Sequence, residues 1–227
     1  MDYRQFKHIS FDLWLTLIQS NPYHKQKRNE LLIDFFNIDA ELSVVSATYS
    51  KFDKLFNKVN EITGRNLDAY ELWLIFLNDL QVDIKKISKA QIDAFVAATE
   101  KLFFEYPPVL IEPSTPHIFK RLVAEGHTLS LLCNTAFTTS VFLRKLLDQL
   151  HISPYFSFQL YSDEMQYSKP SPQVYERMFQ EVSKIKTITK KDILHIGDNE
   201  FADLMGATNF GIAGKLLQPG QGIGHLF

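Results

Sequence analysis

The sequence has 227 residues, of which 45% are hydrophobic and 22% are charged, a profile typical of a globular protein with one large or two modest domains. Its formal net charge of -2 shows no excess of positive charge. The composition therefore gives no electrostatic reason to expect a nucleic-acid partner or an anionic membrane surface.

The first predicted element is a strand over residues 8-12, in which a short apolar run ends in Asp12. The following region, residues 21-108, contains no convincing strand and has four segments with apolar residues three and four apart. The third segment begins with Asp68 and Glu71, and the fourth with Ser88 and Gln91, both at capping-box spacing. Pro107 and Pro108 follow the last segment. We therefore expect a helical cap domain over 21-108, inserted after the first strand of a core formed by 1-20 and 109-227.

The rest of the chain alternates between short β-prone runs and helical patterns. Strands are predicted at 128-133, 157-162, 193-198 and 212-217, and helices at 115-126, 138-150, 171-182 and 200-209. Ser171 and Pro172 have the types that favour a helix N-cap and first helical position. This alternation predicts an α/β fold with a doubly wound parallel sheet and a Rossmann-like core. Ligands of such sheets bind at the carboxyl ends of the strands, where Asp12, Asn134 and Asp198 are expected to converge.

Four stretches resemble motifs of the haloacid dehalogenase-like hydrolase superfamily, which contains phosphatases and dehalogenases. They are FDLWLTL with Asp12, LLCNT with Asn134, YSKPSPQVY with Lys169, and IGDNEFADLMGA with Asp198 and Asp203. Their order and approximate spacing match over essentially the whole chain. The resemblance implies that Asp12 is a nucleophile forming an aspartyl intermediate and that Lys169 stabilises charge.

The same resemblance implies a Mg2+ cofactor and a small phosphorylated substrate. The metal ligands would be the Asp12 carboxylate, the main-chain carbonyl of Trp14 and Asp198. Asp203 would hold Lys169 or a metal-bound water, so it is a candidate for both the catalytic and the metal site. The groups expected to position the substrate are Thr16, Cys133, Asn134 and Lys169.

Two positions depart from the pattern of the superfamily's phosphatases. Trp14 stands where a second Asp usually protonates the leaving oxygen, and Cys133 stands where Ser or Thr is usual. The dehalogenases themselves lack the second acid and need no metal. A Mg2+-dependent phosphatase with weakened acid-base catalysis is the first hypothesis, a metal-independent 2-haloacid dehalogenase the second, and a non-catalytic ligand-binding or regulatory protein the third.

Several other signals are given structural interpretations. Cys133 is the only cysteine, so a disulfide framework is excluded, and its place at the end of a strand favours an inert core thiol. His195 alternates with apolar residues and is predicted to be a core histidine. The run 24-HKQKR-28 favours a solvated helix face, with recruitment of an anionic substrate as its alternative. No signal-peptide or membrane-spanning run is apparent, so we expect a cytoplasmic protein without a membrane partner. The sequence does not indicate whether the protein is a monomer or an oligomer.

Overall fold

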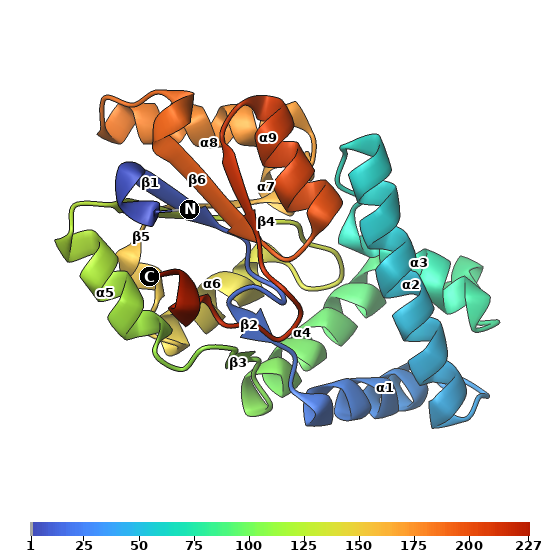
Figure 1. Cartoon of the computed structure of the whole chain (residues 1–227). Coiled ribbons are helices and arrows are strands. Elements are labelled where there is room, and N and C mark those ends of the chain that lie inside the picture. The colour runs from blue at the N-terminus through green and yellow to red at the C-terminus, as the bar shows by residue number, and fades with distance from the viewer. Residues whose placement is uncertain (1) are drawn as a thin grey trace.

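The computed structural model describes residues 2–227 and is built around a five-stranded sheet in the order β5-β4-β1-β6-β7 (Figure 1). The strands are β1 (His8–Phe11), β4 (Thr128–Cys133), β5 (Phe156–Tyr161), β6 (Ile193–Gly197) and β7 (Ala213–Leu216). All four neighbouring pairs are parallel. Every residue of β1 is buried, as a central strand covered on both faces requires.

Helices cover both faces of this sheet. One hydrophobic cluster joins β1, β4 and β5 to α5 (Thr115–Ala124) and α6 (Ser140–Gln149). A second joins β4 and β6 to α8 (Pro172–Ile185) and α9 (Gly206–Phe210), which follows a π-helical turn over Glu200–Met205. The predicted doubly wound parallel sheet is therefore confirmed. Ser171 occupies the N-cap position of α8, but its hydroxyl donates to the Gln173 side chain and makes no capping bond.

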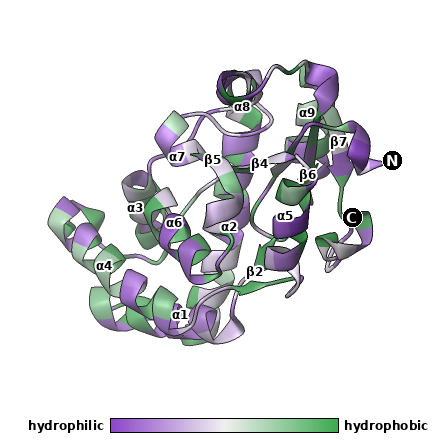
Figure 2. Cartoon of the chain, turned by 90° about the vertical axis from the view of Figure 1, so that its left-hand side faces the viewer, coloured by the Kyte–Doolittle hydropathy of each residue, from purple (hydrophilic) through white to green (hydrophobic). Residues whose placement is uncertain are grey.

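Four helices lie between the two strands of a small antiparallel pair, β2 (Ile18–Gln19) and β3 (Val109–Leu110). They are α1 (Pro22–Phe36), α2 (Leu42–Thr63), α3 (Ala69–Asp79) and α4 (Lys89–Glu105). Figure 1 shows them gathered beside the sheet, and Figure 2 shows that they contain both hydrophobic and hydrophilic residues. Their apolar faces meet in a hydrophobic cluster that also includes Phe137 of the loop after β4, while Phe103 of α4 packs in the cluster of the sheet. No helix within residues 2–227 combines the length and the apolar character needed to cross a membrane.

The beginnings of α3 and α4 test the two capping predictions. Ser88 and Gln91 form the complete capping box of α4, as predicted. At α3, Asp68 accepts a hydrogen bond from the Tyr70 N–H, but Glu71 makes no return bond to Asp68. The capping-box prediction is therefore wrong at Glu71, and α3 begins with a single side-chain cap.

The end of α2 joins the inserted helices to the loops at the carboxyl edge of the sheet. Gly64 ends α2 with φ +65°, and its carbonyl accepts a hydrogen bond from the Ser168 N–H at 3.1 Å. Ser162 Oγ donates to Asn66 Oδ1 at 2.7 Å. These bonds hold the segment before Lys169 against the inserted helices, so α2 contributes to the placement of that lysine.

Candidate active site

Asp12 lies directly after β1, at the carboxyl edge of the sheet. Its N–H continues the strand by donating to the Ile196 carbonyl at 2.8 Å. Its side chain is buried, with Thr16 Oγ1 donating to Oδ2 at 2.9 Å and Lys169 Nζ donating to Oδ1 at 2.7 Å. Both carboxylate oxygens are therefore oriented by other side chains.

Lys169 bridges two carboxylates, one directly after β1 and one in the π-helical turn after β6. Its ammonium donates to Asp12 Oδ1 and, at 2.6 Å, to Asp203 Oδ1. Burial alone would lower the pKa of Lys169, but the two carboxylates outweigh that effect and raise it, so the side chain carries its charge. Asn134 fixes the lysine backbone, since its amide donates to the Lys169 carbonyl at 3.0 Å and its Oδ1 accepts from the Lys169 N–H at 2.7 Å.

Asp203 is fully engaged by hydrogen-bond donors. In addition to Lys169, His195 Nε2 lies 3.0 Å from Oδ1, and the Asn199 N–H donates to Oδ2 at 3.0 Å. Burial would raise the pKa of Asp203, but the Lys169 charge and the His195 contact hold it well below its usual range. Asp203 is thus an ionised carboxylate that anchors Lys169.

His195 is buried as predicted, but its contact with the site was missed. Its Nδ1 lies 3.0 Å from Ser10 Oγ, so the ring links β1 to Asp203. A strand places residues i and i+2 on one face, and a Cβ added at Gly197 would lie 2.2 Å from the Asp203 carboxyl. The spacing between His195 and Gly197 is the sequence signal that could have placed this histidine beside Asp203.

Asp198 follows β6 and completes a group of three acids. One carboxylate oxygen from each of Asp12, Asp198 and Asp203 lies within 4.8 Å of the others. Burial, followed by the charges of Asp12 and Asp203, raises the pKa of Asp198 to about 7. Lys169 supplies one positive charge against three carboxylates, so the group has an excess of negative charge that suits a divalent cation.

The other predicted site residues surround this group. The ring of Trp14 is half-buried and packs against the main hydrophobic cluster. Cys133 is buried, and its thiol donates to the Asn134 carbonyl at 3.3 Å. Burial and then the Asp12 charge raise the pKa of the Cys133 thiol well above its ordinary value, so it stays protonated. One residue that the sequence did not indicate is Glu61 of α2, which accepts from Asn199 Nδ2 at 2.6 Å.

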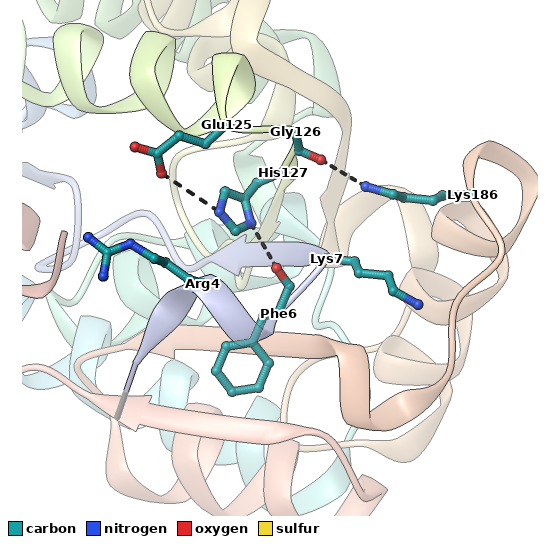
Figure 3. Close-up of a pocket in the computed structure, with 7 residues that line it drawn as sticks. All are labelled: Arg4, Phe6, Lys7, Glu125, Gly126, His127 and Lys186. Atoms are coloured by element: carbon teal, nitrogen blue, oxygen red, sulfur yellow. Dashed lines mark hydrogen bonds and ion pairs between the residues drawn. The ribbon is translucent and has the colours of Figure 1, made fainter.

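A cavity of about 530 Å3 lies elsewhere, between the segment before β1 and the turn before β4 (Figure 3). His127 is drawn between Glu125 and Phe6, and its Nδ1 lies 2.8 Å from the Phe6 carbonyl. These residues precede the amino ends of β1 and β4, whereas Asp12 and Asn134 follow their carboxyl ends. The cavity is therefore at the opposite edge of the sheet from the candidate active site.

Known proteins resemble this chain in sequence and in fold. Residues 6–211 match the family model described as haloacid dehalogenase-like hydrolase. A comparison with curated proteins found no match. A HAD (haloacid dehalogenase) hydrolase, YfnB from Bacillus subtilis bound to magnesium, has a similar structure, with 17% identity, a TM-score of 0.70 and coverage of 93% of this chain and 88% of that one.

Two further solved structures represent two different activities. A HAD phosphatase from Thermococcus onnurineus is 17% identical, with a TM-score of 0.63 and coverage of 94% of this chain and 86% of that one. An L-2-haloacid dehalogenase from Xanthobacter autotrophicus with chloropropionic acid covalently bound is 16% identical, with a TM-score of 0.60 and coverage of 93% and 77%. At these identities the likeness shows a shared fold.

Proposed function

Because this chain belongs to the haloacid dehalogenase-like hydrolases, we propose that it is a Mg2+-dependent phosphatase acting on a small phosphorylated molecule. The observation that carries the proposal is the placement of Asp12. Its buried carboxylate is held by Lys169 and Thr16, next to two further acids. This arrangement suits a nucleophile that attacks a negatively charged electrophile.

The reaction would take place in two displacements at phosphorus. In the first, an Asp12 carboxylate oxygen forms a bond to phosphorus while the bond to the leaving oxygen breaks. The Lys169 ammonium offsets the negative charge of both the nucleophile and the phosphoryl oxygens. In the second, water attacks the aspartyl phosphate, which releases inorganic phosphate and regenerates Asp12.

The residues present fit a divalent cation. Asp12 and Asp198 would hold Mg2+ with the main-chain carbonyl of Trp14, and their excess negative charge supports this assignment. Bound Mg2+ would supply positive charge beside the transferred phosphoryl group. Because Asp203 already accepts from Lys169, His195 and Asn199, we assign it to positioning the lysine.

Trp14 limits which substrates this site can use efficiently. Its indole cannot protonate a leaving oxygen or deprotonate water in place of a second acid, a contribution worth about a hundred- to ten-thousand-fold in rate. Acyl and aryl phosphates depend less on that help because their leaving groups are already acidic. We therefore expect them to be better substrates than alkyl phosphates.

We further propose that residues 21–108 form the cap domain and that 1–20 and 109–227 form the core. The hydrophobic cluster formed mainly by α1–α4 and the β2–β3 pair at the two connections of these helices support this division. The hydrogen bond between Glu61 and Asn199 places the end of α2 beside the loop that follows Asp198. The cap would therefore cover the site and take part in choosing the substrate.

Metal-independent dehalogenation of a 2-haloacid is a second candidate function. The substitution of the second acid by Trp14 favours it, and a protein of the same fold carries chloropropionic acid covalently bound. Against it, a metal bound to Asp12 and Asp198 would reduce the nucleophilicity of the Asp12 carboxylate. Chloride release from 2-chloropropionate in the presence of a chelator would identify this chemistry.

The deciding experiment measures phosphate release from p-nitrophenyl phosphate and acetyl phosphate with and without Mg2+. We expect turnover that requires Mg2+ and falls by on the order of a thousand-fold or more in Asp12→Asn. Asp192→Asn is a matched control, because Asp192 pairs with Lys7 before the amino end of β6. If neither compound is hydrolysed by the wild type, or if Asp12→Asn keeps its activity, the phosphatase proposal is wrong.

A further inference from the structure

A small pocket lies among the inserted helices and the loop that follows β4. We call it the Arg28 pocket and define it by Arg28 of α1, Tyr49 of α2, Trp73 of α3, and Phe137 and Thr138 of the loop. Its volume is about 20 Å3, and a single water needs about 10–15 Å3 on such a scale. The pocket therefore has room for one small polar group between aromatic walls.

Trp73 brings an unpaired donor to this pocket. The side chain is 2% exposed, and its Nε1 has no hydrogen-bond partner among residues 2–227. A buried donor without an acceptor destabilises the folded state. An acceptor on a bound molecule would remove this penalty.

Arg28 brings a positive charge that no carboxylate contacts within the described chain, although Asp53 of α2 favours the charged guanidinium from beyond ion-pair distance. The predicted solvated face holds for Lys25, Gln26 and Lys27, which are exposed, but not for Arg28, which is half-buried 3.2 Å from the centroid of the Tyr49 ring. Its Nε and Nη2 donate to Asn29 Oδ1 at 3.2 and 3.0 Å. Within residues 2–227 it forms no ion pair shorter than 4.0 Å, and its Nη1 donates to no acceptor.

His24, which also lines the pocket, adds no second positive charge. Burial, then the charges of Arg28 and Lys25, lowers the pKa of His24 to about 4, so the ring is neutral at pH 7. The pocket is thus lined by one guanidinium and by the indole whose N–H has no partner. Such a pair matches the two oxygens of a carboxylate, whereas a phosphate dianion is larger and calls for more positive charge.

We propose that the Arg28 pocket binds a carboxylate of the substrate, at the end remote from the group that Asp12 attacks. Phe137 and Thr138 follow Asn134 by three and four residues. At about 3.6 Å per residue, Thr138 lies within roughly 14 Å of Asn134, a distance that one small molecule can span. This inference rests on the proposed function and makes the substrate a phosphorylated carboxylic acid, with the acid placed by the cap helices.

The first test does not depend on turnover. The chain has two tryptophans, so the 15N-labelled protein has two indole N–H signals, and Trp73→Phe identifies the one from Trp73. We expect acetate to shift that signal saturably, acetamide not to shift it, and Arg28→Met to weaken acetate binding at least about tenfold. Lys25→Met, which removes an exposed cation of the same helix, is the matched control and should bind acetate as the wild type does. A shift of equal size with acetamide, or an undiminished one in Arg28→Met, would overturn the proposal.

The second test compares kcat/KM for 4-carboxyphenyl phosphate and phenyl phosphate. We expect the wild type and Lys25→Met to prefer the carboxylated compound at least about tenfold, and Arg28→Met to lose that preference. Equal preference in the wild type and Arg28→Met contradicts a substrate carboxylate at Arg28. If neither ester is hydrolysed, the phosphatase proposal fails. The acetate titration, which needs no turnover, then tests carboxylate binding in the Arg28 pocket on its own.

Discussion

Lys169 holds two of the three clustered acids in this hydrolase. It donates to Asp12 and to Asp203, while His195 and the Asn199 N–H occupy the rest of Asp203. Because its oxygens already accept these hydrogen bonds, Asp203 is suited to orienting Lys169 and not to attacking a substrate. Asp198, with the pKa of its carboxyl raised to about 7 by burial first and then by the neighbouring acids, is the acid with the least neutralised surroundings.

Trp14 can be tested by restoring an acid. We expect Trp14→Asp to raise kcat on an alkyl phosphate such as glycerol 2-phosphate at least about tenfold, because the new carboxyl can protonate the leaving oxygen. The half-buried indole packs on the main hydrophobic cluster, so the variant should also lose about 1–3 kcal/mol of stability. Trp14→Phe is the control and should show no gain in kcat. An unchanged kcat in a folded Trp14→Asp protein would show that position 14 does not face the leaving group.

At the level of the elements, the strands could be predicted from the sequence because short apolar runs between turn signals are typical of buried strands. The contact of His195 with Ser10 could not, since it depends on β6 lying beside β1, and that neighbour relation is made by residues far apart in the chain. Arg28 was likewise assigned to solvent because its partner, Tyr49, belongs to the next helix. Local pattern thus located the site acids, whereas the residues that support them required the strand order and the helix packing.

A second buried histidine, His8, is expected to make the stability of the protein depend on pH. His8 of β1 lies 2.8 Å from Thr128 Oγ1 and 2.9 Å from Ser130 Oγ of β4, and burial, then the charges of Lys186 and His195, lowers its pKa from 6.5 to about 3. Between pH 6.5 and pH 3, His8 is protonated in the unfolded chain but neutral in the folded one. The free energy of unfolding therefore falls as the pH falls from 6.5 toward 3.

Comparing the wild type with His8→Gln measures how much of the pH dependence of stability is due to His8. At about 1.4 kcal/mol per pH unit, His8 should account for a loss of about 2–3 kcal/mol between pH 7 and pH 4.5. Urea unfolding of the wild type and His8→Gln across this range measures it. We expect a shallower pH slope in the variant, and equal slopes would mean that His8 is protonated in the folded protein.

Across the whole molecule, the inserted helices and the sheet have different main hydrophobic clusters, which are joined where Phe103 of α4 enters the cluster of the sheet and Phe137 enters that of the helices. Polar contacts at the end of α2 add to this connection. Glu61 is the contact nearest to the site acids, since Asn199 Nδ2 donates to it and Asn199 is adjacent to Asp198. The backbone hydrogen bond from Ser168 to Gly64 connects the end of α2 to the residue that precedes Lys169. The same helix end therefore contacts the segments that present Asp198 and Lys169.

Removing the Glu61 side chain should loosen the inserted helices selectively. A hydrogen bond to a charged group is worth about 1.5–3 kcal/mol, so we expect Glu61→Ala to speed amide hydrogen exchange in α1–α4 and in the loop after β6, while β1 and β4 keep their protection. Glu61→Gln retains an acceptor for Asn199 and should show a smaller change. Exchange followed by mass spectrometry resolves these segments. Equal acceleration in the sheet and in the helices would mean that the two parts open as one unit, and the division into core and cap would then have no energetic basis.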